Sequence, residues 1–167
     1  MPAFHSTVAP MQYHSPVSTL MSRFKFYQDL AAGRLLAELF CRNTQNIELP
    51  EVLIPVPLHG KRLRQRGFDQ ALELAKWIAR HKGLALRTDL LARVRHTDAQ
   101  SDLNATERRR NCKDAFVLKN RSLPGHIALL DDVMTTGTTV SECAKVLKQA
   151  GVKRVDIWVI ARVAKPG

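Results

Sequence analysis

Two adjacent carboxylates and a run of threonines lie close together in the C-terminal third of the chain. Asp131 and Asp132 directly follow the apolar segment Ile127–Leu130, which has the length of a strand. A parallel strand buried on both faces can place carboxylates only at its carboxyl end, where open α/β sheets bind their ligands. We therefore expect the acid pair at the ligand-binding edge of a sheet and take both residues as candidate catalytic groups.

The segment that follows has the features of a phosphate-binding loop. It offers hydroxyls, closely spaced backbone N–H groups and one glycine that can adopt a positive φ. A helical pattern begins directly after it and ends at Gly151. Because N–H groups at a helix N-terminus attract anions, this loop is expected to bind a phosphate. Its residues are Thr135, Thr136, Gly137, Thr138 and Thr139.

The acid pair lies just upstream of that loop and admits two ligands. It could hold the vicinal hydroxyls of a sugar, or a divalent metal ion such as Mg²⁺ through one or two oxygens of Asp131 and Asp132. A phosphate one turn from a diol-binding pair fits a ribose 5-phosphate. The alternative is a strand, a polar turn and a capped helix without a ligand, because each motif alone is common in turns.

The charge of the chain favours anionic partners. Its 167 residues carry 26 Lys and Arg against 15 Asp and Glu, a net charge of +11. A polyphosphate ligand, a nucleic acid, or both would suit this excess, and plain basicity is the alternative. Four of the cations lie in Lys61–Arg66, which is either a solvated loop or part of a phosphate site. Phe24, Phe26 and Tyr27 are predicted to pack on a core rather than to stack on bases.

Composition points to one globular domain in a reducing compartment. The hydrophobic content of 45% and charged content of 25% are ordinary for a globular protein, and the length suffices for a real core. The longest apolar runs are too short to cross a bilayer, and no secretory signal is visible. Cys41, Cys112 and Cys143 form neither a Cys-x-x-Cys pair nor a disulfide framework. We expect a cytoplasmic protein with no zinc.

The order of the elements predicts an α/β domain with a mainly parallel sheet flanked by helices. Residues 1–14 are expected to be a loose N-terminal arm, and residues 15–167 the domain. Helical spacing predicts two helices between Val17 and Phe40, with a break near Asp29 and Gly33. A further helix is predicted from Asp69, as its N-cap, to Arg80. Strand-like segments are 52–55, 84–94, 115–118, 127–130 and 155–163.

Two connections in this order are candidates for ligand contacts. Prolines confine the strand at 52–55 and stiffen the loop Pro55–Leu58 that follows it. Since parallel strands end at one edge, the ends at Ile54 and Leu130 should meet, and both following loops could face one ligand. The polar segment His96–Thr106 is predicted to be a long, lid-like loop, followed by a short basic helix at 106–112.

Several of these motifs resemble those of a known family. Leu129–Thr139 resembles the phosphoribosyl pyrophosphate (PRPP) motif of type I phosphoribosyltransferases. Ile54–His59, Arg64–Gln70, Gln100–Leu103, Arg108–Asn111 and Ala115–Phe116 resemble the ComF/GntX branch of that superfamily, as does the segment around Phe24-Lys-Phe26. The resemblance implies a type I phosphoribosyltransferase-like, Rossmann-like fold over residues 13–163. Members of the branch usually begin with a four-cysteine zinc module, which this sequence does not contain.

The resemblance also implies roles for particular residues. The acid pair would bind the ribose hydroxyls and residues 135–139 the 5-phosphate. A flexible hood would lie near residues 100–110, and Mg²⁺ would accompany the pyrophosphate. The family's Asn in the Arg-Gly-Phe-Asn-Gln pattern is Asp69 here. The resemblance implies that the loop formed by Pro55, Val56, Pro57 and Leu58 contacts the pyrophosphate. Arg64, Arg66 and Arg108 are cations that could also bind it.

Two functions remain open at this stage. In the first, the protein is a phosphoribosyltransferase-like enzyme that uses PRPP, with Asp131 and Asp132 orienting the ribose as positive charge develops on it. In the second, the same pocket holds PRPP or a nucleotide without turnover, while basic surfaces bind single-stranded DNA through its phosphates. The resemblance links both to the uptake or use of external DNA in bacteria, with other DNA-uptake proteins as partners.

Overall fold

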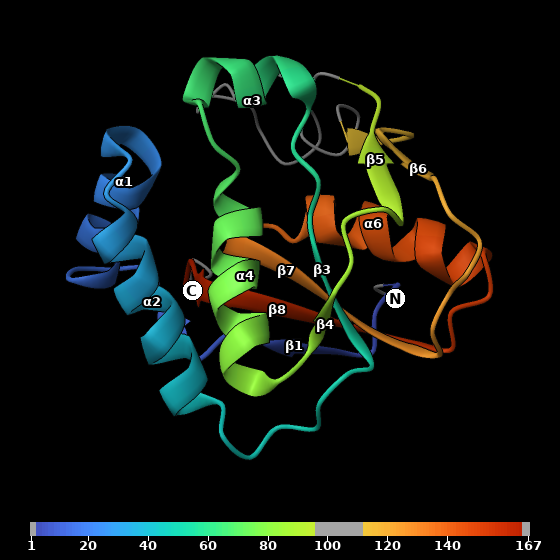
Figure 1. Cartoon of the computed structure of the whole chain (residues 1–167), viewed down its shortest axis with the longest axis horizontal. Coiled ribbons are helices and arrows are strands. Elements are labelled where there is room, and N and C mark those ends of the chain that lie inside the picture. Colours follow the sequence, from blue (N-terminus) through green and yellow to red (C-terminus); the bar gives the residue numbers. More distant parts are fainter. Residues whose placement is uncertain (1–2, 96–111, 165–167) are drawn as a thin grey trace.

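A parallel sheet forms the centre of the computed structural model, which describes residues 3–95 and 112–164 (Figure 1). Within these residues six strands pair in the order β1-β8-β7-β3-β4, with β2 also on β8, and every pair is parallel. A separate antiparallel pair, β5 with β6, lies outside this sheet. The strands are β1 Ser6–Val8, β2 Met11–Gln12, β3 Val52–Pro55, β4 Ala85–Leu86, β5 Leu91–Arg93, β6 Phe116–Leu118, β7 His126–Met134 and β8 Arg154–Arg162.

Helices cover both faces of the sheet, so the predicted α/β class with a mainly parallel sheet is confirmed. One face packs against α1 (Val17–Tyr27), α2 (Leu30–Asn43) and α4 (Gln70–Lys82), and the other against α6 (Thr138–Gln149). Successive side chains of a strand point to opposite faces. Accordingly, Ala128 and Leu130 of β7 belong to the core under α2 and α4, whereas Ile127 and Leu129 belong to the core under α6.

The helix boundaries follow from local chemistry, with one correction. Asp69 caps α4 as predicted, because its carboxylate accepts a hydrogen bond from the N–H of Leu72. Asp29 caps α2 in the same way, through the N–H of Ala32. The predicted break between two helices is confirmed at Asp29, whereas Gly33, which also suggested it, lies inside α2. Its missing side chain leaves room for Phe24, because a Cβ there would lie 2.4 Å from Cε2 of that ring.

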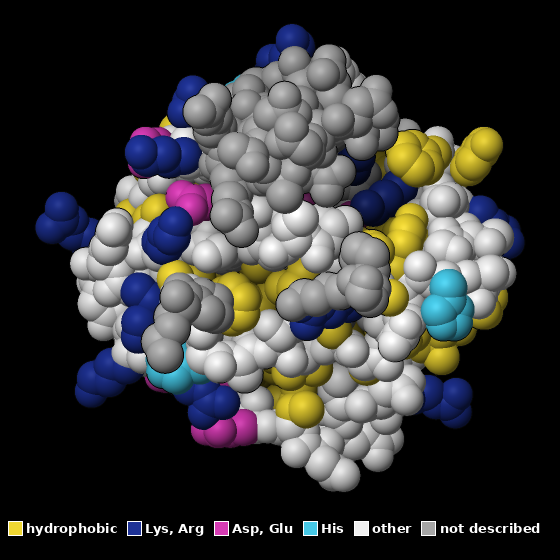
Figure 2. Space-filling view, turned by 180° about the vertical axis from the view of Figure 1, so that it is seen from behind, with side chains coloured by type: hydrophobic (Ala, Val, Ile, Leu, Met, Phe, Trp, Pro, Cys, Tyr) yellow, Lys and Arg dark blue, Asp and Glu magenta, His cyan; other side chains and the backbone are white. Residues whose placement is uncertain are grey.

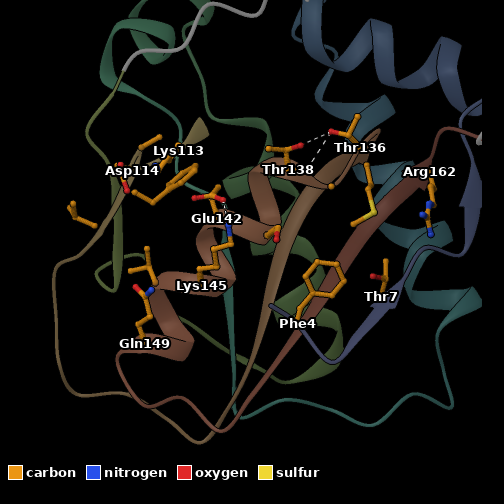
Figure 3. A pocket seen from close by; sticks show the side chains of 17 residues that line it. Phe4, Thr7, Lys113, Asp114, Thr136, Thr138, Glu142, Lys145, Gln149 and Arg162 are labelled. Carbon is orange, nitrogen blue, oxygen red and sulfur yellow. Dashed lines mark hydrogen bonds and ion pairs between the residues drawn. The ribbon is translucent and has the colours of Figure 1, made fainter. Parts of the chain in front are cut away.

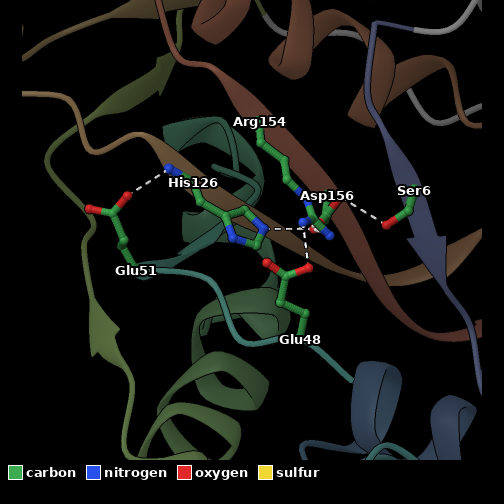
Figure 4. Close-up of polar contacts among 6 residues, drawn as sticks. All are labelled: Ser6, Glu48, Glu51, His126, Arg154 and Asp156. Carbon is green, nitrogen blue, oxygen red and sulfur yellow. Dashed lines mark hydrogen bonds and ion pairs between the residues drawn. The ribbon is translucent and has the colours of Figure 1, made fainter. Parts of the chain in front are cut away.

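The N-terminal segment is not the loose arm that was predicted for residues 1–14. β1 and β2 pair with β8 and give that long strand a second neighbour beside β7. Ser6 donates a hydrogen bond to Asp156, whose carboxylate also contacts His126 and Arg154 (Figure 4). These contacts bury Asp156, and they hold its pKa below the usual value in spite of burial. The two strands are only three and two residues long, which is too short for a clear periodic pattern in the sequence.

Two further boundaries differ from the prediction near the acid pair. β7 does not end at Leu130 but runs to Met134, because β8 continues to pair with it beyond Asp131. β3 stops at Pro55, opposite Leu130. The basic run forms a short helix, α3 (Gly60–Arg66), instead of a loop, and Gly67 ends it with a φ of 79°. The acid pair therefore lies on strand backbone that extends past the end of β3.

Some predictions fall on residues that the structure does not describe. The lid-like loop at 96–106, the hood near 100–110, the basic helix at 106–112 apart from its last residue, and Arg108 all lie outside the described residues. Across the described parts of the chain, no helix combines the length and apolar character needed to cross a membrane.

Candidate functional site

The two carboxylates of the acid pair project from opposite faces of the sheet. The alternation along β7 places Asp131 on the side of α6 and Asp132 on the side of α1 and α4. Next to them, the N–H of Val56 donates a hydrogen bond of 2.8 Å to the carbonyl of Leu130. The start of the Pro55–Leu58 loop and the acid pair are thus brought to one edge of the sheet, as predicted from the strand ends.

Asp132 has a close partner on α1. The Lys25 ammonium lies 2.8 Å from Oδ2 of Asp132, and the side chains of both residues are mostly buried. The other oxygen, Oδ1, accepts a hydrogen bond of 2.6 Å from the N–H of Val133. Lys25 was not among the predicted site residues. No signal in the sequence pointed to it, because Lys25 is one of several polar residues of α1.

Asp131 lies in a less polar environment. Burial raises its pKa to about 7, and the neighbouring charge of Asp132 adds to the rise. A hydrogen bond from the N–H of Asp132 to Oδ1 and the positive charge of Lys25 oppose that rise. Near neutral pH this carboxyl can therefore exchange a proton, and it can donate as well as accept a hydrogen bond.

A third carboxyl lies on the same side as Asp132. Burial raises the pKa of Asp69, and the charge of Asp132 contributes to the rise. The next residue, Gln70, is buried, and its amide nitrogen has no hydrogen-bond partner among the described residues. An unpaired buried amide is costly, so a polar partner such as water or a ligand is expected there. Asp69 was predicted only as a helix cap, and its proximity to Asp132 could not be inferred from spacing.

The threonine loop forms the N-terminus of α6, as predicted. Gly137 is the N-cap residue with a φ of 75°, which favours glycine at this position. The hydroxyls of Thr136 and Thr138 lie 2.9 Å apart, and Thr135 and Thr136 are exposed. The Thr139 hydroxyl instead faces inward, 3.8 Å from the sulfur of Cys112. Hydroxyls and free helix N–H groups thus converge where a phosphate was predicted.

A groove of about 920 Å³ runs from this loop along α6 (Figure 3). Thr136 and Thr138 stand at one end of it, and Glu142 and Lys145, which pair with each other, line its wall on α6. The residues that line the groove include Gly137 but neither carboxylate of the acid pair. The threonine loop therefore separates two surfaces, the acid pair and this groove.

The predicted pyrophosphate residues are placed unevenly. Pro55 and Val56 are buried, and Pro57 and Leu58 are partly exposed. The prolines have no N–H, and the N–H of Val56 already donates to Leu130. Arg64 is exposed and Arg66 partly exposed on α3, which follows β3 at the edge where that strand ends (Figure 1). The carbonyl of Arg66 accepts a hydrogen bond from Gln28, which ties α3 to the end of α1.

The acid pair does not offer a metal ion the open oxygens that it needs. Both oxygens of Asp132 and one oxygen of Asp131 already accept hydrogen bonds or an ion pair, and the pKa of Asp131 is raised. Among residues 3–95 and 112–164, no group of three or more His, Cys, Asp or Glu side chains could hold a metal ion. Direct ligation of Mg²⁺ by Asp131 and Asp132 would therefore compete with Lys25 for Asp132, and it stays a prediction.

The aromatic residues of α1 divide into two groups. Phe24 is fully buried, with its ring centroid 5.3 Å from that of Phe68, so its predicted core role is confirmed. The same prediction is wrong for Phe26 and Tyr27, whose exposed fractions are 69% and 80%. They belong to the end of α1 that Gln28 joins to α3, and their exposure leaves them open to contacts with a partner.

Positive charge is distributed over several parts of the described surface. On the described part of the face opposite to that of Figure 1, hydrophobic side chains are visible near the centre, and Lys and Arg side chains occur both among them and along the outline (Figure 2). The residues of α3 are different, because four cations occupy seven helical positions there. Among the described elements, α3 is therefore a concentrated cationic segment.

Comparison with known proteins gives a consistent set of relatives. Competence protein F of Haemophilus influenzae is 37% identical over 170 residues, covering 96% of this chain and 74% of that protein. The DNA utilization protein YhgH of Salmonella typhimurium is 35% identical over 167 residues, with the same coverage. Competence protein ComFC of Streptococcus pneumoniae is 29% identical over 150 residues, covering 90% of this chain and 65% of that protein. No family model matches the chain.

Solved structures with a similar chain trace are more distant. An adenine phosphoribosyltransferase from Thermoanaerobacter pseudethanolicus is 13% identical, with a TM-score of 0.49, covering 81% of this chain and 83% of that one. An orotate phosphoribosyltransferase from Aeropyrum pernix is 15% identical, also with a TM-score of 0.49, covering 81% and 74%.

Proposed function

We propose that this chain, which belongs to the family of competence protein F and the DNA utilization protein YhgH, binds the ribose 5-phosphate part of PRPP and acts in the use of external DNA. We infer the ligand from the acid pair on the extension of β7, which is followed directly by the threonine loop at the N-terminus of α6. The role in DNA use is supported by the names of these relatives.

The acid pair supplies the contacts for the ribose hydroxyls. A hydroxyl both donates and accepts hydrogen bonds, and it finds both kinds of partner here. The carboxylate of Asp132 accepts, Lys25 beside it donates, and Asp131 exchanges between the two roles near neutral pH. The buried amide of Gln70, next to Asp69, is a further donor that awaits a partner.

The threonine loop supplies the contacts for the 5-phosphate. Backbone N–H groups in the first turn of α6 have no intrahelical acceptor, and the hydroxyls of Thr136 and Thr138 stand beside them. The loop carries no charged side chain, so the phosphate would be held by N–H and O–H donors and by the dipole of α6. The pyrophosphate would extend toward the loop that begins at Pro55, and its Mg²⁺ remains a prediction.

Calorimetric titration tests this proposal with three ligands. PRPP and ribose 5-phosphate are expected to bind, whereas ribose without the phosphate should bind far more weakly. Asp132→Asn should weaken PRPP binding at least tenfold, because a carboxylate that accepts from hydroxyls becomes a neutral amide. Glu38→Gln is a matched control, since Glu38 is exposed on α2 and does not line the groove beside the threonine loop. Equal affinity of wild type and the Asp132 variant would remove the acid pair from the site.

Turnover is tested separately from binding. Pyrophosphate released from PRPP is measured across a panel of nucleobases and other nucleophiles, with and without Mg²⁺. Release that depends on one acceptor would identify the protein as a phosphoribosyltransferase. PRPP binding without release for any acceptor would identify a non-catalytic binding module.

A second candidate function is binding of single-stranded DNA, and one observation favours it. Phe26 and Tyr27 are exposed at the end of α1, which Gln28 joins to the last residue of α3, the short helix that carries Lys61 and Arg64. Base stacking on aromatic rings together with cations along the backbone is the usual mode of binding single strands. This surface could act together with the PRPP site or without it.

Its test is fluorescence anisotropy with a labelled oligonucleotide at several salt concentrations. Replacing both Phe26 and Tyr27 by Ala should weaken binding at least tenfold with little change of the salt dependence. Replacing Lys61 and Arg64 by Ala should flatten the salt dependence, because fewer counterions are released. Unchanged affinity in both variants would exclude this surface as the DNA site.

A further inference from the structure

We propose that Lys25 supplies the cation of the acid pair from within the chain, so that the ligand-free protein binds no divalent metal ion at Asp131 and Asp132. The basis is the arrangement of charges around Asp132. Lys25 reaches it from a different element, α1, and lies where a metal ion would otherwise neutralise the carboxylate.

The ion pair is close and sheltered from water. Nζ of Lys25 lies 2.8 Å from Oδ2 of Asp132, with 19% and 15% of the two side chains exposed. Ion pairs on an open surface are weak because water screens them, whereas a buried carboxylate that loses its partner is strongly destabilised. A divalent ion at Asp132 would have to displace the ammonium or share the carboxylate with it, and two cations at that distance repel each other.

Packing fixes the position from which Lys25 acts. Its neighbour Phe24 is fully buried and contacts Phe68 and Trp77, with ring centroids 5.3 and 6.3 Å away. Gly33 of α2 lies against the same ring, without a side chain to push it outward. Because Phe24 holds this turn of α1 against α2 and α4, the backbone of Lys25 cannot swing away from Asp132 without disrupting the core.

The carboxyl groups near Lys25 are best compensated by a cation that does not dissociate. Asp69, Asp131 and Asp132 all contribute carboxyls, and the pKa values of Asp69 and Asp131 are raised mainly by burial. An ammonium on a fixed helix compensates Asp132 at all times, whereas a dissociable metal would leave the carboxylate uncompensated when it departs. Lys25 therefore positions the carboxylate of Asp132 and favours neutral hydroxyls over metal ions as its ligands.

One consequence depends on the proposed function. An ammonium has three N–H donors, and within residues 3–95 and 112–164 the pair with Asp132 is the one ion pair of Lys25. Lys25 could therefore also donate to a ribose hydroxyl that in turn donates to Asp132. If PRPP is the ligand, its Mg²⁺ would then enter only on the pyrophosphate. The charge compensation itself does not depend on the identity of the ligand.

Manganese binding to the ligand-free full-length chain tests the proposal, with free Mn²⁺ followed by electron paramagnetic resonance. Wild type and Asp132→Asn should show the same weak binding, because the pair does not take the ion. Lys25→Met removes the ammonium and keeps the side-chain length, and it should bind Mn²⁺ at least tenfold more tightly than wild type. Adding Asp132→Asn to that variant should abolish the gain, and Lys25→Arg, which keeps the charge, should behave as wild type.

Two results would overturn the proposal. The first is Mn²⁺ binding by wild type that Asp132→Asn weakens tenfold, since the pair would then hold a metal despite Lys25. The second is a folded Lys25→Met variant without any gain in Mn²⁺ affinity. If Lys25→Met does not fold alone, its thermal unfolding is followed with and without Mn²⁺, and the double variant with Asp132→Asn serves as the charge-balanced reference. Recovery of the fold by Mn²⁺ supports the proposal, and no recovery by Mn²⁺ contradicts it.

These measurements do not use PRPP, so they separate this proposal from the proposed function. Wild type that fails to bind PRPP while the manganese results hold would remove the ligand and leave the role of Lys25. PRPP binding together with Asp132-dependent Mn²⁺ binding in wild type would support the ligand and contradict the role of Lys25.

Discussion

Replacing Asp131 by Asn should change how the stability of the protein depends on pH. The folded protein raises the pKa of Asp131 from 3.8 to about 7, chiefly through burial. A raised pKa means that the folded state binds this proton more tightly than the unfolded state does. Wild type therefore loses stability as the pH rises from about 4 to about 7, and no further loss from this group occurs above that range. The amide of Asn cannot ionise, so the variant avoids that loss.

The size of the effect follows from the shift. One pKa unit corresponds to about 1.4 kcal/mol, so a rise of about three units sets an upper limit of about 4 kcal/mol. The amide can still accept the hydrogen bond that Oδ1 of Asp131 receives from Asp132, so geometry need not change. We expect Asp131→Asn to gain on the order of 1–4 kcal/mol relative to wild type between pH 4 and pH 8.

Urea unfolding at half-unit steps from pH 4 to pH 8 measures this difference. Asp114→Asn is the control, because Asp114 is exposed and has a positive φ that Asn also tolerates. Its curve should run parallel to that of wild type. Parallel curves for wild type and Asp131→Asn would refute the reasoning, since Asp131 would then ionise equally in the folded and unfolded states.

Three other substitutions test the surroundings of the site. Gly33→Ala should destabilise the protein by about 1–3 kcal/mol in urea unfolding, because the new methyl group would meet Phe24; Gly60→Ala, which meets only the end of Arg64 at 3.8 Å, should have little effect. Gly137→Ala should cost about 1–2 kcal/mol through its positive φ and also weaken ribose 5-phosphate binding in calorimetry. Gly151→Ala, with a φ of 103° and open space around it, should lose stability but keep that affinity. Asp156→Asn should destabilise the N-terminal pairing and speed hydrogen exchange in β1, since Ser6, His126 and Arg154 lose a charged acceptor.

The sequence was informative where a local rule decides the structure. Asp69 follows the pattern of a helix cap, and the apolar run before Asp131 could only be a buried strand, so the parallel sheet and the threonine loop were predictable. The family was also predictable, because its motifs are long and occur in order, and relatives at 33–37% identity confirm it. Composition and spacing are enough to predict these features, and no knowledge of tertiary contacts is needed.

Other features depend on contacts between distant residues. The extension of β7 to Met134 exists because β8 is long enough to pair with it, which no signal near Asp131 reveals. The pairing of residues 6–12 requires the free side of β8, and strands of three and two residues give no clear periodic signal. Gly33 resembles a helix break until Phe24 is seen to occupy its open side.

The candidate site divides in the same way. The carboxylates and threonines are contiguous in sequence, so their grouping was visible. Lys25 precedes Asp132 by more than a hundred residues, and only the packing of α1 brings the two together. Phe26 and Tyr27 were assigned to the core because they follow Phe24, yet α1 has only one buried face and these two residues lie outside it.

Hydrogen exchange with ribose 5-phosphate tests the central claim most directly, because it locates the ligand on the chain. Exchange is followed by mass spectrometry with the ligand, with ribose alone and with inorganic phosphate. Ribose 5-phosphate should slow exchange across residues 131–139 and the first turn of α6, and Asp131→Asn/Asp132→Asn should reduce that protection. Protection confined to α3 and the end of α1, or none at all, would contradict a ribose 5-phosphate site formed by the acid pair and the threonine loop.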